Sequence, residues 1–145
     1  MYTSTEVEGA LKRITARFKR QDAALLIGRA HERMVTHRVA VLLEKEFRGW
    51  NVDCEYNRQG FGLDPKCDSA GKRRFPDIIA HKRGCIDCAA NLLVIEAKPA
   101  WPTAGRKESD RNKLRRVSKK FGYQYAYFMT YNSGEDGTLH FARVQ

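Results

Sequence analysis

The sequence has no apolar run long enough to cross a bilayer. Its longest runs are Val39 to Leu43 and Leu92 to Ile95, far short of the roughly 20 residues that a membrane helix needs. The first six residues, MYTSTE, have neither the basic start nor the apolar stretch of a secretory signal. We therefore expect a cytoplasmic protein with no membrane segment.

Acidic residues are scarce relative to basic ones. The chain has 17 Asp and Glu against 27 Lys and Arg, which gives a formal net charge of +10. Such an excess is typical of proteins that bind a polyanion, either nucleic acid or an anionic lipid surface. With 42% hydrophobic residues the chain is too apolar to stay disordered, and its 145 residues predict a single domain over residues 1–145.

Cysteine is also scarce, and in a cytoplasmic protein we expect no disulfides. Cys85 and Cys88 form one CxxC pair, but Cys54 and Cys67 are too widely spaced to supply a second pair. Free thiols are the expected state. The alternative is a structural or partner-binding domain held together by a Zn²⁺ ion that all four cysteines bind. In such a domain the carboxylates would have no functional role.

Three helical segments precede the first predicted strand. Thr3 and Glu6 have the spacing of a capping box and are followed by an apolar stripe, so residues 1–21 contain an N-terminal helical extension. Asp22 is positioned to cap a second, short helix. The longest helix is predicted for residues 30–47, and Gly49 ends it.

The remaining patterns predict a mixed sheet. Strands are expected at residues 51–58, 75–81, 91–98, 123–131 and 139–144, with a basic helix at 105–120. In the first strand, the alternation puts Asp53 and Glu55 on a solvated face. The fold class is therefore α/β, with a central sheet flanked by helices and one parallel strand pair created by the crossover helix.

The chemically informative feature is Asp77 followed, after eighteen residues, by Glu96-Ala97-Lys98. If strands 75–81 and 91–98 form a hairpin, residues whose numbers add up to about 173 lie opposite one another, and Asp77 faces Glu96. Glu96 and Lys98 are two residues apart, so they share a face. Two carboxylates this close repel each other unless a divalent cation lies between them, and Mg²⁺ prefers carboxylate oxygens. The spacing predicts a metal site.

A simpler interpretation makes Asp77 a turn residue and the Glu96 to Lys98 segment a solvated strand end. Against it, Ile95 and Ala97 flank the charges, and the apolar run indicates a strand interior, where an unpaired charge is costly. We favour the metal site.

These residues resemble the motif of the PD-(D/E)xK nuclease superfamily, whose restriction-endonuclease-like core has the element order αβββαβ. The resemblance covers about residues 22–131. Segments 32–43 and 53–58, together with Asp110 and Lys113-Leu114, are similar to an uncharacterised bacterial branch of that superfamily.

The resemblance implies roles for individual residues. Asp77 and Glu96 would be Mg²⁺ or Mn²⁺ ligands, with the carbonyl of Ala97 as a further ligand, and Lys98 would orient or deprotonate the attacking water. Glu32 matches a carboxylate that the first core helix often supplies. Members of the superfamily usually leave a 5′-phosphate.

Two further carboxylates have alternative explanations. Glu32 is the one charge on a helical stripe with residues 35, 39 and 42, which favours a site role, yet an acid in the first turn of a helix is also favoured by the macrodipole. Glu55 would at most support the cluster from the neighbouring strand.

Basic residues concentrate after the proposed site. Residues 105–120 hold eight Lys or Arg and two acids, and Arg111, Arg115 and Lys119 lie on one helical face. Further cations, Arg73, Arg74 and Lys82, lie near the hairpin. Cations arranged in this way neutralise phosphates and bind nucleic acid without regard to sequence.

The sequence thus predicts a Mg²⁺-dependent nuclease acting on DNA, with RNA as an alternative substrate. A rival prediction is a catalytically inactive nucleic-acid-binding module that acts as a subunit of a larger complex. A homodimer is compatible with either function, because cutting both strands of a duplex commonly uses two sites.

Overall fold

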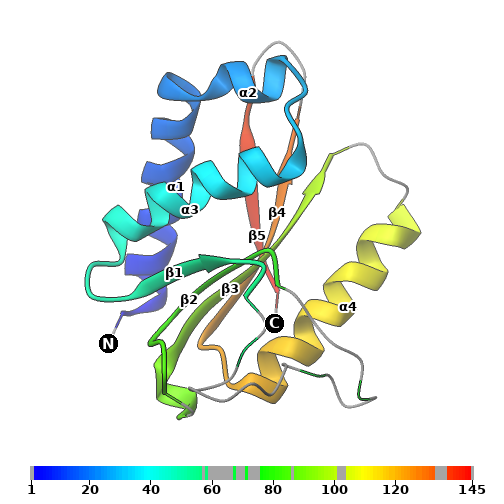
Figure 1. The fold of residues 1–145 in the computed structure, drawn as a ribbon. Coiled ribbons are helices and arrows are strands. Elements are labelled where there is room, and N and C mark those ends of the chain that lie inside the picture. Colours follow the sequence, from blue (N-terminus) through cyan, green and yellow to red (C-terminus); the bar gives the residue numbers. More distant parts are fainter. Residues whose placement is uncertain are drawn as a thin grey trace.

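The structure is a computed structural model that describes residues 2–56, 58, 67, 71, 76–85, 87–100, 104–132 and 137–144. Along this part of the chain, three helices come first, followed by three strands, one helix and two final strands (Figure 1). In chain order the elements are α1 (Ser4–Gln21), α2 (Ala23–Ile27), α3 (Glu32–Glu46), β1 (Asn51–Cys54), β2 (Ile78–His81), the 3₁₀ turn η1 (Cys88–Ala90), β3 (Asn91–Pro99), α4 (Ala104–Phe121), β4 (Tyr125–Tyr131) and β5 (Leu139–Arg143).

The strands form one five-stranded sheet in the order β1-β2-β3-β4-β5. Neighbours pair antiparallel except β3 and β4, which are parallel because α4 carries the chain from the end of one to the start of the other. The predicted α/β class, with a mixed sheet between helices and one parallel pair, is confirmed.

Helices cover the two faces of the sheet unequally. α1, α2 and α3 lie on one face and α4 on the other (Figure 1). The central strand β3 is buried on both faces, since Ile95 packs with the α1 and α3 side and Val94 with the α4 side. Charged residues at the ends of β3 are therefore held at the rim of a rigid layer.

Of the two predicted helix caps, the one at the start of α1 is present and the one at the start of α2 is not. Thr3 and Glu6 form the expected capping box, with Thr3 N donating to Glu6 Oε2 at 2.7 Å. Asp22 precedes α2, but its carboxylate accepts a hydrogen bond from Arg38 Nε of α3 at 2.7 Å and makes no capping bond. Asp22 therefore links two helices.

The first strand is shorter than the predicted 51–58 segment. β1 ends at Cys54, because Glu55 adopts a left-handed backbone conformation (φ 51°) that an extended strand does not accommodate. Residues beyond it therefore do not continue the alternation, and Glu55 is not part of a strand face. None of the helices in the described segments is long and apolar enough to cross a membrane.

The structure corrects the prediction that Asp53 lies on a solvated face. His81 Nε2 lies 2.8 Å from Asp53 Oδ2, and Arg83 forms two hydrogen bonds with the same carboxylate. His81 itself is buried. The Asp53 side chain thus joins β1 to the end of β2.

Candidate active site

The predicted hairpin register is confirmed. Ile78 pairs with Ile95 and Ile79 with Val94, and both pairs add up to 173. Asp77 directly precedes β2, and its Oδ2 accepts a hydrogen bond from Ala97 N at 2.7 Å. Asp77 is thereby fixed beside Glu96 at the end of the hairpin.

The Lys98 ammonium lies among three carboxylates. Lys98 Nζ is 3.4 Å from Glu96 Oε1, 3.6 Å from Glu32 Oε1 and 3.8 Å from Asp77 Oδ2. Asp77 and Glu96 come from the β2–β3 hairpin, whereas Glu32 comes from the first turn of α3. The fold thus brings all four predicted catalytic residues together from the first turn of α3 and from the distant β2–β3 hairpin.

Without a bound metal ion, the site is unfavourable for the ionised form of its carboxyl groups. Burial raises the pKa of Asp77, although the Lys98 ammonium and the Ala97 N–H act against this. Burial raises the pKa of Glu96, and the neighbouring Asp77 raises it further. Burial alone would lower the pKa of Lys98, but the surrounding carboxylates raise it. The single ammonium group of Lys98 therefore offsets only part of the negative charge of the three carboxylates.

Glu32 is both a residue of the first turn of α3 and a member of the cluster. Its Oε2 accepts a hydrogen bond from the Tyr131 hydroxyl at 3.4 Å, and burial together with the Glu32 charge raises the pKa of Tyr131 to about 12. The hydroxyl therefore stays protonated and oriented toward Glu32. Tyr131, at the end of β4, was not predicted as a site residue, because no local pattern links it to α3.

Asp110 is a further carboxylate that the sequence analysis did not assign. It is buried on α4, where its Oδ1 accepts a hydrogen bond from Lys113 Nζ at 2.7 Å, and its charge contributes to the raised pKa of Glu96. A signal was present in the sequence. Asp110 has helical spacing with Leu114, Val117 and Phe121, so it is an acid on an apolar stripe, as Glu32 is.

Two residues expected at the edge of the site contact it through the backbone. Glu55 N donates to the Asp77 carbonyl at 3.1 Å, while the Glu55 side chain, which is half exposed, pairs with Arg33 at 3.1 Å. Ala97 is buried and holds Asp77 through its N–H. A ligand role for the Ala97 carbonyl stays a prediction.

The predicted DNA-binding residues of α4 differ in their surroundings. Arg111 lies over the Phe128 ring, with its Cζ 5.2 Å from the ring centroid, and is half-buried. Arg115 is exposed and pairs with Glu108 at 3.0 Å. Lys119 is exposed and has no ion pair within the described part of the chain.

Of the predicted cations near the hairpin, Lys82 is described. It donates to the Gly49 carbonyl and lies over the Trp50 ring, 5.0 Å from its centroid. Arg73 and Arg74 lie outside the described residues. The nucleic-acid role of all three stays a prediction.

The donor set fits a hard cation in its chemistry, since Asp77 and Glu96 offer anionic oxygens at a partly buried site. Among the residues that the structure describes, however, no group of three His, Cys, Asp or Glu side chains is placed to hold a metal ion. Cys54, Cys67 and Cys85 likewise belong to no such group of described residues, and all three are free thiols. The Cys88 side chain lies outside what is described.

Comparison of the chain with protein-family models, with curated proteins and with solved structures found no match.

Proposed function

We propose that this protein is a Mg²⁺-dependent nuclease that hydrolyses phosphodiester bonds in DNA, with a restriction-endonuclease-like core of the PD-(D/E)xK type. The observation that carries the proposal is the meeting of Asp77, Glu96 and Lys98 at one end of the β2–β3 hairpin. A purely structural role does not account for three buried or half-buried charges at a sheet rim with an excess of negative charge.

Each residue has a role in the proposed reaction. Asp77 and Glu96 would hold the cation, which would supply positive charge to the scissile phosphate and make water more acidic. Lys98 orients the attacking water and offsets the negative charge that develops on the phosphate. Glu32, from α3, would help to hold the Lys98 ammonium in place, with its Oε1 3.6 Å away. The water oxygen bonds to phosphorus as the bond to the 3′ oxygen breaks, leaving a 5′-phosphate.

The exposed cations of α4 support DNA as the substrate. α4 begins shortly after β3, and the charge of Asp110 acts on Glu96, so the part of α4 around Asp110 and Arg111 is the part near the proposed site. The other end of α4 lies at the start of β3, where Asn91 Nδ2 donates to the Phe121 carbonyl at 2.8 Å. Cutting both strands of a duplex would use two copies of this site, and a homodimer stays a prediction.

The direct test is cleavage of a supercoiled plasmid and of labelled oligonucleotides with Mg²⁺ or Mn²⁺. Replacing Asp77 by Asn, or Lys98 by Gln, should lower cleavage by about a thousandfold, because each change removes a charge that acts on the reacting phosphate. Glu44→Gln, an exposed acid on α3, is the matched control and should cleave normally.

Cleavage that persists in Asp77→Asn, or in an excess of EDTA, would overturn the proposal. RNA oligonucleotides of the same sequence decide the substrate class. Cleavage of RNA but not of DNA would support the same active site with RNA as its substrate.

A second candidate function has an observation in its favour. Because the Lys98 ammonium already lies 3.4 to 3.8 Å from three carboxylates, the cluster is partly neutralised without a metal, as expected of an inactive nucleic-acid-binding module. Calorimetric titration with Mg²⁺ and Mn²⁺ separates the two functions. Tight DNA binding with no metal binding at millimolar concentration would favour the inactive module.

A further inference from the structure

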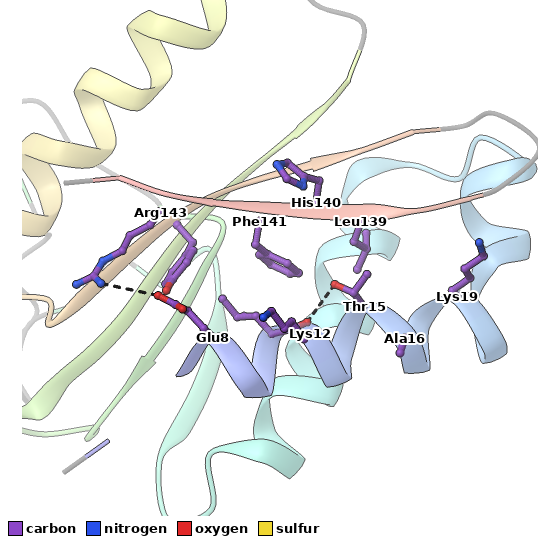
Figure 2. A pocket seen from close by; sticks show the side chains of 11 residues that line it. Glu8, Lys12, Thr15, Ala16, Lys19, Leu139, His140, Phe141 and Arg143 are labelled. Atoms are coloured by element: carbon purple, nitrogen blue, oxygen red, sulfur yellow. Dashed lines mark hydrogen bonds and ion pairs between the residues drawn. The ribbon is translucent and has the colours of Figure 1, made fainter. Parts of the chain in front are cut away.

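A groove runs between α1 and β5, away from the Lys98 cluster (Figure 2). Its volume is about 590 Å³, within the usual range of ligand sites. The groove is open along one side, so a small molecule in it would stay largely in water. Its lining includes Leu11, Lys12, Ala16 and Lys19 of α1 and Leu139 and Phe141 of β5.

The groove follows the open edge of the sheet. β5 is the last strand in the order, and in the described part of the chain no strand pairs with its outer side. Val144 N bonds to the Ala126 carbonyl and Asn132 N to the Thr138 carbonyl. In an antiparallel pair such bonds recur at every second residue, so the N–H and C=O groups of Leu139, Phe141 and Arg143 point outward. The residues whose side chains line the groove thus also present unpaired backbone groups.

The groove combines an apolar floor with a basic rim. Leu139 is buried and Phe141 half-buried, and both point from β5 toward α1 (Figure 2). Lys12 and Lys19 are exposed on the rim and form no ion pair with any described residue. The one acid of the lining, Glu8, already accepts a hydrogen bond from Ser4 and lies 4.0 Å from Arg143.

The wall of the groove also holds a polar atom without a partner. The Tyr127 hydroxyl is buried, and no described residue forms a hydrogen bond with it. Tyr127 as a whole is 3% exposed. A buried hydroxyl without a partner is unusual in a folded protein, and it points to a group that binds there.

We propose that this groove binds an acidic polypeptide segment, which adds to β5 as a further strand. Its backbone would pair with Leu139, Phe141 and Arg143. Alternate side chains of an added strand face the same side, so apolar ones would lie on the floor and acidic ones would meet Lys12 and Lys19. This inference goes beyond the nuclease proposal and does not depend on it.

Two other occupants fit less well. A nucleic acid would match the rim but would cover the apolar floor with phosphates and sugars. A second copy of this chain would bring the basic rim, including Lys12, Lys19 and Arg143, against its own like charges. Charge complementarity therefore favours the acidic segment.

The probe is a fluorescein-labelled octapeptide of alternating valine and glutamate, and its binding to the full chain is followed by fluorescence anisotropy. The wild-type protein should bind it. The same peptide N-methylated at every second residue, which leaves its charge unchanged, should bind at least tenfold more weakly, because strand addition needs the backbone N–H groups.

A matched pair of variants tests the rim. Lys19→Glu should weaken binding about fivefold, whereas Arg20→Glu, on the same helix but outside the groove, changes the net charge equally and should have little effect. Should a variant fail to fold, the N-methylated peptide still provides the test on the wild-type protein.

Three outcomes would overturn the proposal. The first is no binding at about 1 mM protein, or equal binding of the N-methylated peptide. The second is displacement of the peptide by a short DNA duplex in wild-type protein but not in Lys19→Glu, which would assign the groove to nucleic acid. The third is a dimer in sedimentation experiments that Phe141→Asp dissociates, which would assign it to a second copy.

Discussion

At the scale of single residues, the main feature is the imbalance of charge around Lys98. Three carboxylates surround one ammonium, and burial adds to the cost of keeping Asp77 and Glu96 ionised. Residues that destabilise a fold are retained where the strain serves a purpose, so the cluster is expected to trade stability for binding.

Replacing Glu96 by Gln should therefore stabilise the protein. At neutral pH in EDTA, we expect the melting temperature to rise by about 4 °C, which corresponds to roughly 1 kcal/mol for a domain of this size. Addition of Mg²⁺ should raise the melting temperature of the wild-type protein and have a much smaller effect on the variant, because a ligand stabilises the state that binds it. Thermal unfolding followed by circular dichroism measures both.

Glu44→Gln is again the matched control, since it removes an exposed acid of α3. It should change neither the melting temperature nor the response to Mg²⁺. A lower melting temperature for Glu96→Gln would mean that the Lys98 ion pair outweighs the repulsion among the carboxylates.

Most of this cluster could be predicted from the sequence, for a physical reason. Residues that pair across a hairpin have position numbers with a constant sum, so the approach of Asp77 and Glu96 follows from their spacing around the turn. The helical spacing that marks Glu32 also marks Asp110, which the sequence analysis did not assign. The contact of Tyr131 with Glu32 could not be predicted, because it depends on how α3 lies across the sheet.

At the scale of elements, α4 has two faces of different character. Its apolar stripe of Leu114, Val117 and Phe121 packs on the sheet, and its other faces are mostly basic. Ion pairs hold some of these cations, since Glu108 lies near both Arg111 and Arg115. Lys119 is free of such pairs in the described part of the chain, but it lies near the end of α4 that contacts the start of β3.

Changing Arg111, Arg115 and Lys119 together to Gln should weaken DNA binding about equally for unrelated sequences. The slope of log K against log salt should fall by up to roughly 0.9 for each lost phosphate contact, while metal affinity stays unchanged. Titrations of a labelled duplex at several salt concentrations measure this slope.

The matched control removes three exposed cations, as Arg20→Gln on α1, Lys45→Gln on α3 and Arg48→Gln just after α3, and these helices cover the face of the sheet opposite α4. If both triple variants lower the slope equally, net charge and not α4 determines binding. A change confined to one DNA sequence would point instead to base recognition.

The elements themselves were predicted, but two strand boundaries were clearly wrong: β1 ends at Cys54 and not at residue 58, and β2 begins at Ile78 and not at residue 75. Apolar periodicity identified α3, β3 and α4, because long patterns with buried faces leave few alternatives. The end of β1 was placed too late, since the left-handed conformation of Glu55 is not a preference of glutamate and is imposed by its surroundings. One such surrounding contact is the bond from its N–H to the Asp77 carbonyl.

At the scale of the whole molecule, the stability of the sheet edge depends on pH through Asp53. Burial alone would raise the pKa of Asp53, but hydrogen bonds from Arg83 and His81 lower it below its usual value. A carboxyl with a lowered pKa in the folded state stabilises the fold above its ordinary pKa. That stabilisation is lost as the pH falls from about 4 through the lowered value.

Asp53→Asn should accordingly lower the free energy of unfolding by about 1 to 3 kcal/mol at neutral pH. The difference from wild type should shrink as the pH falls below about 4. Urea unfolding at a series of pH values measures it, with Asp87→Asn on an exposed turn as the control. A difference that stays constant down to about pH 3 would show that the loss is steric and not electrostatic.

The contact between α1 and β5 has a consequence for how the protein is made. The Tyr125 hydroxyl donates to the Tyr2 carbonyl at 2.8 Å, and Arg143 bonds to Ser4 Oγ at 2.6 Å, so segments 123 and 139 positions apart are joined. During translation, α1 leaves the ribosome on the order of 10 s before β5, at about 5 to 20 residues per second. Until β5 follows, the side of α1 that packs against β5 lacks its partner strand. Native closure of the sheet is thus a late event, and slow translation of the segment between α1 and β5 would prolong the period in which the nascent chain is prone to aggregate.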